Sequence, residues 1–508
     1  MPLARALSIA LVGVVGHVIE VEADLAVGLP GLAIVGLPDA SLSEARDRVR
    51  AAVVNSGQSW PARRITLGLS PATLPKHGSG FDLAIAAAIL AAAGVAPATA
   101  LHGNALVGEL GLDGRVRPVR GVLPAALAAQ RAGLTGIVVP AGNMREAALV
   151  PGLAVRGVSS LTALLGWMRG DAGEELPPAG SERDTSLAQP APDLIDVVGQ
   201  GYGRMAVEVA AAGGHHLLLL GPPGAGKTML AERMPGVLPP LDLQAALEVT
   251  AVHSVAGVLP AGAPLVSRPP YQAPHHSASV AALVGGGSGL ARPGALSLAH
   301  RGVLFLDEAP EFPGGVLDAL RQPMERGEVV LARSGGVTRY PARVQLVLAA
   351  NPCPCSSPLG DQACTCTANA RRRYLGRLSG PLLDRIDLQV ELLPIRLAAL
   401  LTDAADLESS AAVRARVAAA RAAAAERLAG TGWRTNSEVP GQVLRHRWRL
   451  ARSVRRAADE ALDQGHLSAR GYDRVIRVAW TLADLGGRLT PDAGDVGEAC
   501  QLRTAQAA

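Results

Sequence analysis

Eight consecutive residues have the types and spacing of a phosphate-binding loop. Residues 221–228 read GPPGAGKT, which matches G-x-x-x-x-G-K-[ST], and the apolar run Leu217 to Leu220 precedes them. Glycines let the backbone curl so that successive N–H groups face phosphate oxygens, while a lysine neutralises charge and a hydroxyl ligates magnesium. The predicted ATP-binding residues are Gly221, Pro222, Pro223, Gly224, Ala225, Gly226, Lys227 and Thr228.

A second apolar run, GVLFLDE, delivers two adjacent carboxylates at Asp307 and Glu308. Asp307, together with Thr228, is predicted to hold Mg²⁺. Glu308 is predicted to act as the general base or to position water for attack on the γ-phosphate. Asn351 follows a third apolar run and is predicted to polarise that water, although an isolated asparagine after a strand is more often a turn residue.

Four of the five cysteines lie in one short segment. Their pattern is C-x-C-x8-C-x-C, and the residues are Cys353, Cys355, Cys364 and Cys366. Four soft ligands in one loop suit a tetrahedral structural zinc. Reduced, unliganded thiols and a redox pair remain alternatives.

These residues need a scaffold that brings strand ends together. Residues 193–395 carry apolar runs that end in the phosphate loop, the acidic pair and Asn351, as buried parallel strands do. Ligands of open α/β sheets bind at the carboxyl ends of such strands. Residues 1–170 alternate strand-like and Ala-rich helical stretches, residues 171–192 read as a linker, and residues 396–508 read as helices.

Composition limits the class of protein. The net charge of +4 and the pI near 9.0 permit a nucleic-acid partner without demonstrating one. Of the 48 basic residues only Lys76 and Lys227 are lysines, so a lysine inside a glycine loop is favoured as chemically required. The few, clustered cysteines favour a reducing cytoplasm. No membrane span is predicted, and the apolar N-terminal run reads as a buried strand rather than a signal peptide.

Longer strings carry a family resemblance over nearly the whole chain. They are IVGLPDA at 34–40, LPKHGSGFDL at 74–83, APHHSAS at 273–279, SLAHRGVLFLDE at 297–308, NPCPC at 351–355 and LSGPLLDRIDL at 378–388. With them the sequence resembles the ComM/YifB family of magnesium-chelatase-like AAA+ ATPases. The resemblance implies an α/β AAA+ core with a helical lid, assembled as a ring, expected to be a hexamer.

The resemblance also implies two arginines for the ATP site. Arg385 in LLDRID matches the arginine finger that would act on the adjacent subunit's ATP, and Arg470 in LSARGYDR matches the sensor 2 position of the lid. Arg474 is the near alternative to Arg470. Either arginine could instead be an ordinary surface residue.

The first domain resembles the proteolytic α+β domain of Lon proteases without its catalytic dyad. By its strings PKHGSG and GELGLDGRVRPVRGVLPAAL, the serine position falls on Gly80 and the lysine position on Leu123. Neither residue can serve as nucleophile or base, so no peptidase activity is predicted. Ser79 is one residue away, but no lysine other than Lys76 and Lys227 exists to activate it.

The resemblance implies a DNA motor of the branch-migration helicase type, which assists recombination in natural transformation. The insert over 267–292 contains paired histidines and glycines, for which a hydrogen-bonding or DNA-facing role is favoured over a metal site. Arg292 and the cluster Arg371, Arg372 and Arg373 either contact phosphates or form a solvated basic face. With few aromatics to stack bases, no sequence specificity is expected. The alternatives are a protein-remodelling ATPase, like the motor subunit of magnesium chelatase, and a nucleotide-dependent scaffold.

Overall fold

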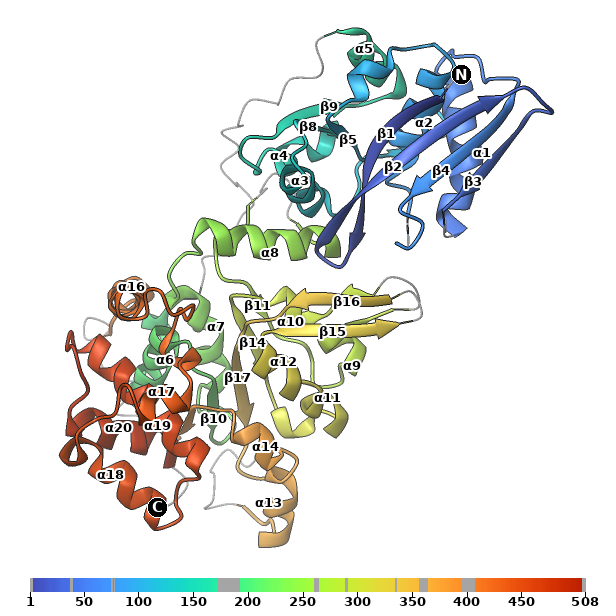
Figure 1. Cartoon of the computed structure of the whole chain (residues 1–508). Helices are drawn as coiled ribbons and strands as arrows, with labels where there is room; N and C mark the ends of the chain where they lie inside the picture. The colour runs from blue at the N-terminus through green and yellow to red at the C-terminus, as the bar shows by residue number, and fades with distance from the viewer. Residues whose placement is uncertain are drawn as a thin grey trace.

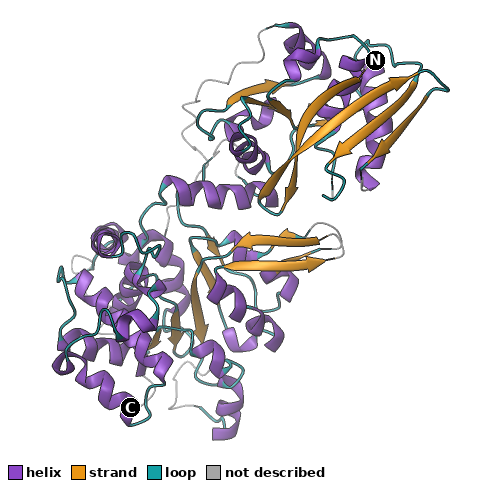
Figure 2. Ribbon diagram, in the orientation of Figure 1, coloured by secondary structure: helices purple, strands orange, loops and turns teal. Residues whose placement is uncertain are grey.

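The chain builds an N-terminal sheet domain, a parallel-sheet core and a set of C-terminal helices (Figure 1, Figure 2). The structure is a computed structural model that describes residues 3–36, 40–74, 76, 78–171, 192–259, 265–287, 291–333, 336–355, 364–394 and 407–504. Most of the linker predicted over 171–192, and the boundary predicted between 395 and 396, lie outside these residues.

The N-terminal domain contains a seven-stranded sheet in the order β3-β4-β2-β1-β5-β8-β9. Its central hairpin pairs β1 with β2 antiparallel, and the strands on the β5 side run parallel. The strands are β1 (Leu3–Val12), β2 (Val15–Ala26), β3 (Gly31–Val35), β4 (Arg64–Ser70), β5 (Asn104–Leu106), β8 (Gly136–Pro140) and β9 (Ala154–Val158). A small separate ladder joins β6 (Glu109–Leu110) to β7 (Val116–Arg117).

Helices cover both faces of this sheet because successive strand residues point to opposite sides. Val138 belongs to the core shared with α1 (Ala40–Asn55), α2 (Asp82–Ala92) and α5 (Leu161–Arg169). Its neighbours Ile137 and Val139 belong to the core on the other face, shared with α3 (Val122–Arg131) and α4 (Met144–Ala147). Nearly every residue of α2 is buried, which explains why that helix is apolar on all sides.

The second sheet is parallel and has the strand order β11-β14-β17-β10-β18. Its strands are β11 (Tyr271–Gln272), β14 (Val303–Leu306), β17 (Gln345–Ala350), β10 (Leu217–Leu220) and β18 (Leu388–Glu391). All residues of β10, β14 and β17 are buried, as expected for strands covered on both faces. The apolar runs of the sequence are therefore the three inner strands of this sheet.

Helices and short inserts surround the parallel sheet. A hairpin of β15 (Glu328–Arg333) and β16 (Gly336–Pro341) projects beside it (Figure 1). The remaining elements before the lid are α6 (Gly201–Gly213), α7 (Lys227–Val237), α8 (Leu243–Ala256), α9 (Val280–Val284), β12 (Gly285–Gly286), β13 (Arg292–Pro293), α10 (Ala295–Leu298), α11 (Gly314–Ala319), α12 (Arg321–Arg326), α13 (Ala368–Leu375) and α14 (Gly380–Leu383).

Helix α8 joins the two sheet domains. It lies between them and packs against α3 (Figure 1). The buried carboxylate of Glu146 accepts hydrogen bonds from the Ser254 hydroxyl of α8, from Asn143 Nδ2 at 3.2 Å and from the backbone N–H of Leu123 at 2.8 Å. A buried acceptor satisfied from both domains fixes their relative position.

The C-terminal helices pack on the flank of the parallel sheet that carries α6 and α7. They are α16 (Ser410–Arg427), α17 (Gly441–Arg445), α18 (Arg452–Asp463), α19 (Ala469–Leu485) and α20 (Ala493–Thr504). One continuous apolar core joins them to the sheet, from Leu217 of β10 to Val475 of α19. Arg427 of α16 links this helix to α19. It pairs with Asp484 at 2.6 Å and lies 4.6 Å from the ring centre of Trp480.

Candidate active site

The predicted phosphate loop connects the end of β10 to the start of α7. Gly224 and Gly226 have φ of 78° and 85°, a backbone conformation that side chains rarely adopt. A Cβ on Gly221 would lie 2.7 Å from the carbonyl oxygen of Leu392, so this position has no room for a side chain. The curled loop ends at the N-terminus of α7, whose first N–H groups can bind an anion.

Lys227 lies inside this loop and is 8% exposed. Its Nζ donates to the carbonyl oxygens of Gly221 at 2.7 Å and Pro222 at 2.9 Å, and to Asn351 Oδ1 at 3.0 Å. Burial lowers the pKa of Lys227, and the charges of Asp307 and Glu308 oppose that shift. The ammonium group is thus held by neutral oxygens at the position where phosphate oxygens could replace them.

The strand ends bring the predicted magnesium ligands together. Thr228 is the second residue of α7, and its hydroxyl donates to Asp307 Oδ2 at 2.7 Å. The other oxygen of Asp307 accepts the backbone N–H of Glu308 at 2.8 Å. A hydroxyl and a carboxylate oxygen are the ligand types that Mg²⁺ prefers. This pair, contributed by β14 and α7, can therefore bind the cation.

Glu308 follows β14 in a left-handed conformation with φ of 49°. Such a conformation is uncommon for a residue with a side chain and marks a locally constrained turn. Glu308 Oε2 lies 3.1 Å from His276 Nδ1. The sequence grouped His276 with the insert but gave no sign of this contact, which depends on the insert crossing the sheet edge.

Asn351 is buried at the end of β17, between the phosphate loop and the acidic pair. The preceding residue, Ala350, accepts the backbone N–H of Gly221 at 3.1 Å. Together with the bond from Lys227, this contact locks the two strand ends to each other. Asn351 therefore lies where a water-polarising amide would be needed.

The two predicted arginines lie near the amino ends of the core strands, whereas the phosphate loop lies at the carboxyl ends. Arg385 and Arg470 line the same cavity of about 580 Å³. The cavity is bordered by residues that directly precede the core strands, namely His216, Gly302 and Val344. Arg385 pairs with Glu325, and Arg470 is exposed. Neither arginine contacts the phosphate loop of its own chain.

Arg474, the alternative to Arg470, is engaged in the fold. It donates to the carbonyl oxygen of Asp384 at 2.6 Å and pairs with the buried carboxylate of Asp387. Burial raises the pKa of Asp387, but Arg474 and the neighbouring histidines outweigh that effect and hold it well below its usual range. The more exposed Arg470 is therefore freer than Arg474 to reach a second molecule.

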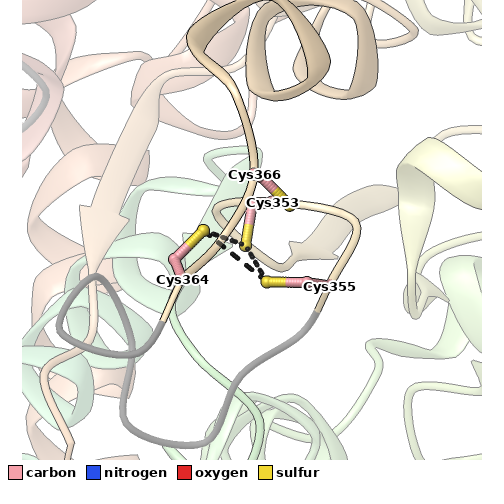
Figure 3. A group of neighbouring side chains, drawn as sticks. All are labelled: Cys353, Cys355, Cys364 and Cys366. Carbon is pink, nitrogen blue, oxygen red and sulfur yellow. Dashed lines mark hydrogen bonds between the residues drawn. The ribbon is translucent and has the colours of Figure 1, made fainter.

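The four clustered cysteines converge on one point (Figure 3). Their Sγ atoms all lie within 4.8 Å of one another, and the separations for Cys353 with Cys355 and for Cys364 with Cys353 are 3.1 Å and 3.4 Å. Zn–S bonds of about 2.3 Å in a tetrahedron require S–S separations near 3.8 Å. A small outward movement would thus accommodate zinc. Cys500, apart from this cluster, packs partly buried against the lid core.

The two positions predicted to correspond to the Lon dyad are Gly80 and Leu123, which have neither a hydroxyl nor an amine. Leu123 is fully buried in α3, and the Cβ of a side chain at Gly80 would meet only Val107, at 3.9 Å. The Ser79 hydroxyl donates to Glu109, not to an amine. Lys76 is fully buried, and its Nζ donates to three backbone carbonyls at 2.6 to 3.0 Å.

A parallel sheet with a phosphate loop after one inner strand, and an acidic pair after another, defines a P-loop ATPase. Comparison with known families agrees with this class. The family described as "Magnesium chelatase, subunit ChlI" matches residues 193–400, "Subunit ChlI of Mg-chelatase" matches 21–143, and "Magnesium chelatase, subunit ChlI C-terminal" matches 407–503.

Individual relatives cover almost the whole chain. An uncharacterized protein of Mycobacterium tuberculosis is 58% identical over 503 residues, which is 99% of each chain. YifB of Escherichia coli is 42% identical over 94% of this chain and 92% of its own length. Competence protein ComM of Haemophilus influenzae is 41% identical over 96% and 94% respectively. The chain belongs to the ComM/YifB family of magnesium-chelatase-like AAA+ ATPases.

A partial similarity concerns the first domain. The Lon protease of Mycolicibacterium smegmatis is 32% identical over 153 residues, which is 29% of this chain and 19% of that protease. Within the described part of the chain, no helix has both the length and the apolar character needed to cross a membrane.

Proposed function

We propose that this protein is a ring-forming ATPase that moves DNA, of the branch-migration type that assists recombination during natural transformation. The observation that carries the proposal is its similarity to competence protein ComM over 94% of that protein's length. The exposed side chains of Arg292, Arg372 and Arg373 supply positive charge that could track a phosphate backbone.

The proposed roles at the ATP site follow from the contacts described above. Lys227 would exchange its carbonyl partners for β- and γ-phosphate oxygens. Thr228 and Asp307 would hold Mg²⁺, which neutralises charge on the transferred phosphoryl group. Glu308 would take the proton of the attacking water, while Asn351 orients that water and keeps Lys227 in place.

A ring is proposed because Arg385 and Arg470 lie far from their own phosphate loop. If one subunit presents its arginine face to the next subunit's ATP, the site is complete only in an assembly. We expect a hexamer when ATP is bound. Arg385→Ala should leave ATP binding intact while abolishing hydrolysis, and mixing it with Lys227→Ala should restore partial activity. Mixing without any recovery would contradict shared sites.

ATPase rates with and without DNA test the motor proposal. Single-stranded, duplex and branched DNA should stimulate hydrolysis severalfold, with Glu308→Gln as the inactive control, and labelled junctions should be resolved only with ATP. Hydrolysis that is indifferent to every DNA would favour the alternative, a protein-remodelling ATPase of the magnesium-chelatase motor type. Absence of hydrolysis in the wild-type protein would instead favour a nucleotide-dependent scaffold.

We further propose that Cys353, Cys355, Cys364 and Cys366 hold one structural zinc. The ion would link Cys353 and Cys355, which follow Asn351, to Cys364 and Cys366, which precede the basic helix α13. Such a reduced cluster fits the proposed cytoplasmic location. Elemental analysis should give one zinc per chain, and Cys364→Ser should lose it. A folded wild-type preparation without metal would refute the proposal.

The N-terminal domain is proposed to act as a scaffold or substrate contact without peptidase activity. The absence of both dyad side chains at Gly80 and Leu123 supports this proposal. ATP-dependent cleavage of casein that Ser79→Ala abolishes would contradict it.

A further inference from the structure

The C-terminal helices carry a pocket that the proposed ATPase does not use. It has a volume of about 370 Å³ and lies where α17, α18 and α19 meet (Figure 1). On α19 it is lined by Ala469, Tyr472 and Ile476, which share one face of that helix. Arg470 and Asp473 of α19, which line the larger arginine cavity, lie on the adjoining face. The pocket is therefore separate from the site proposed for the neighbouring subunit's ATP.

The floor of this pocket is apolar. Leu444, Tyr472 and Ile476 line it and are buried in the fold. Leu450 and Leu462 also line it and remain partly exposed, Leu462 at 36%. A cavity of this size and character has room for a large aliphatic or aromatic side chain. Protein interfaces commonly centre on one such side chain held in a pocket.

The charged groups next to the apolar floor are already paired within the chain. Asp459 accepts hydrogen bonds from Arg455 at 3.1 Å and from the Tyr472 hydroxyl at 3.0 Å. Arg445 pairs with Asp473 at 2.6 Å. An apolar side chain that enters the pocket would therefore leave no lone charge without water or a partner.

One side of the pocket is strongly basic. Residues 445–456 contain six arginines and no acidic residue. Three of these arginines form ion pairs with acidic residues of α18 and α19. The other three, Arg447, Arg449 and Arg452, are exposed and form no ion pair with any residue that the structure describes, and His446 is exposed beside them. Unpaired guanidinium groups can bind carboxylates through two parallel hydrogen bonds.

Two of the unpaired arginines lie at the pocket itself. Arg449 lines it directly. Arg452 lines a neighbouring hollow that shares Asp459 and Leu462 with the pocket. Positive charge and an apolar cavity are thus within reach of one short ligand.

The apolar floor distinguishes between the two classes of acidic partner, nucleic acid and protein. Proteins that bind nucleic acid without sequence preference use positive charge together with aromatic rings on which bases stack. The aromatic rings near this pocket are engaged in the fold, since Tyr472 is buried and Trp448 lies 5.5 Å from Trp480 between ring centres. A cavity for an apolar side chain beside unpaired arginines matches an acidic peptide instead.

We propose that this pocket docks an acidic segment of a partner protein. A large aliphatic or aromatic side chain of the segment enters the apolar floor, and adjacent carboxylates pair with Arg449 and Arg452. The proposal does not depend on whether the motor acts on DNA. Because the contact is small and partly ionic, an isolated segment binds weakly and less well at high salt.

The test measures binding of fluorescein-labelled hexapeptides to the full-length protein by fluorescence anisotropy. The probe has the sequence Glu-Asp-Glu-Asp-Leu-Phe. One control peptide replaces its four acids by lysine, and the other replaces its two apolar residues by serine. The wild-type protein should bind the probe at least about tenfold more tightly than either control peptide.

Two variants separate the basic side from the apolar floor. Arg449→Glu should weaken binding of the probe at least about tenfold, because it replaces attraction by repulsion. Leu462→Ser should weaken it about threefold to tenfold, because it removes apolar surface from the pocket. Arg131→Glu and Leu489→Ser change exposed residues outside the pocket and should bind like the wild type.

Each outcome decides for or against the pocket. Equal binding of all three peptides by the wild type, or binding of none, overturns the proposal. If Arg449→Glu binds the probe normally but loses single-stranded DNA, the basic side contacts nucleic acid and the proposal fails. It also fails if Leu462→Ser changes the number of subunits per ring in light scattering but leaves probe binding unchanged, because the pocket is then a contact between copies. Should Arg449→Glu not fold, Arg452→Glu must show the loss of probe binding.

Discussion

Two adjacent histidines should make the ATPase core lose stability in mild acid. Burial lowers the pKa of His215 and of His216 from 6.5 to about 4, because the charged ring loses its water. His215 Nε2 lies 2.8 Å from the Thr481 hydroxyl, and His216 Nδ1 accepts the backbone N–H of Leu346 at 3.0 Å. A nitrogen that accepts an N–H cannot be protonated without breaking that bond.

The sign and size of the effect follow from proton linkage. Between pH 6.5 and about 4 the unfolded chain binds more protons than the folded chain, so the free energy of unfolding falls as the pH falls through this window. Above this pH window the two histidines do not reduce the free energy of unfolding. From about pH 7 to about pH 5 each histidine contributes a loss of about 2 kcal/mol, so the pair contributes about 4 kcal/mol at most. His216 is partly exposed at the cavity, and its share is the smaller one.

Urea unfolding followed by tryptophan fluorescence measures this loss. Trp60 and Trp167 belong to the N-terminal core and should be replaced by Phe, so that the remaining tryptophans report on the core and lid. His215→Gln and His216→Asn keep a polar atom near the bonded nitrogen but cannot titrate in this range. Between the two pH values the double variant should lose about 2 to 4 kcal/mol less than the parent, with the larger share from His215. Equal losses in both proteins would refute the reasoning, and His446→Asn is the control.

Three further changes test other parts of the molecule. Lys76→Met should lower the unfolding free energy of the N-terminal domain by about 3 kcal/mol, because it leaves three partly buried carbonyls without their donor. Unchanged unfolding, followed by the fluorescence of Trp60 and Trp167, would contradict this. Asn351→Ala should lower kcat about 100-fold with little change in ATP affinity, which single-turnover rates and nucleotide titration would separate. Ser254→Ala should cost about 1 kcal/mol and increase hydrogen exchange at the α3–α8 contact, and identical exchange would argue against a fixed domain interface.

Much of the candidate ATP site was predictable from local sequence patterns. GPPGAGKT specifies its own backbone, since Gly224 and Gly226 adopt the positive φ that the loop requires. The apolar runs before Asp307 and Asn351 became adjacent inner strands whose ends meet. These features were predictable because a buried strand needs an apolar run and a phosphate loop needs glycines at fixed spacing.

Contacts between distant segments were not predictable in this way. No pattern in the sequence indicates that His276 reaches Glu308 or that Glu146 binds α8. None indicates that Arg385 and Arg470 share a cavity away from the phosphate loop. Each depends on how elements pack across dozens to hundreds of residues, and no local pattern encodes that distance. The sequence by itself determined the chemistry available at each strand end and the family. Only the tertiary structure decided which side chains meet, because strand order and helix packing, not spacing along the chain, set the distances between them.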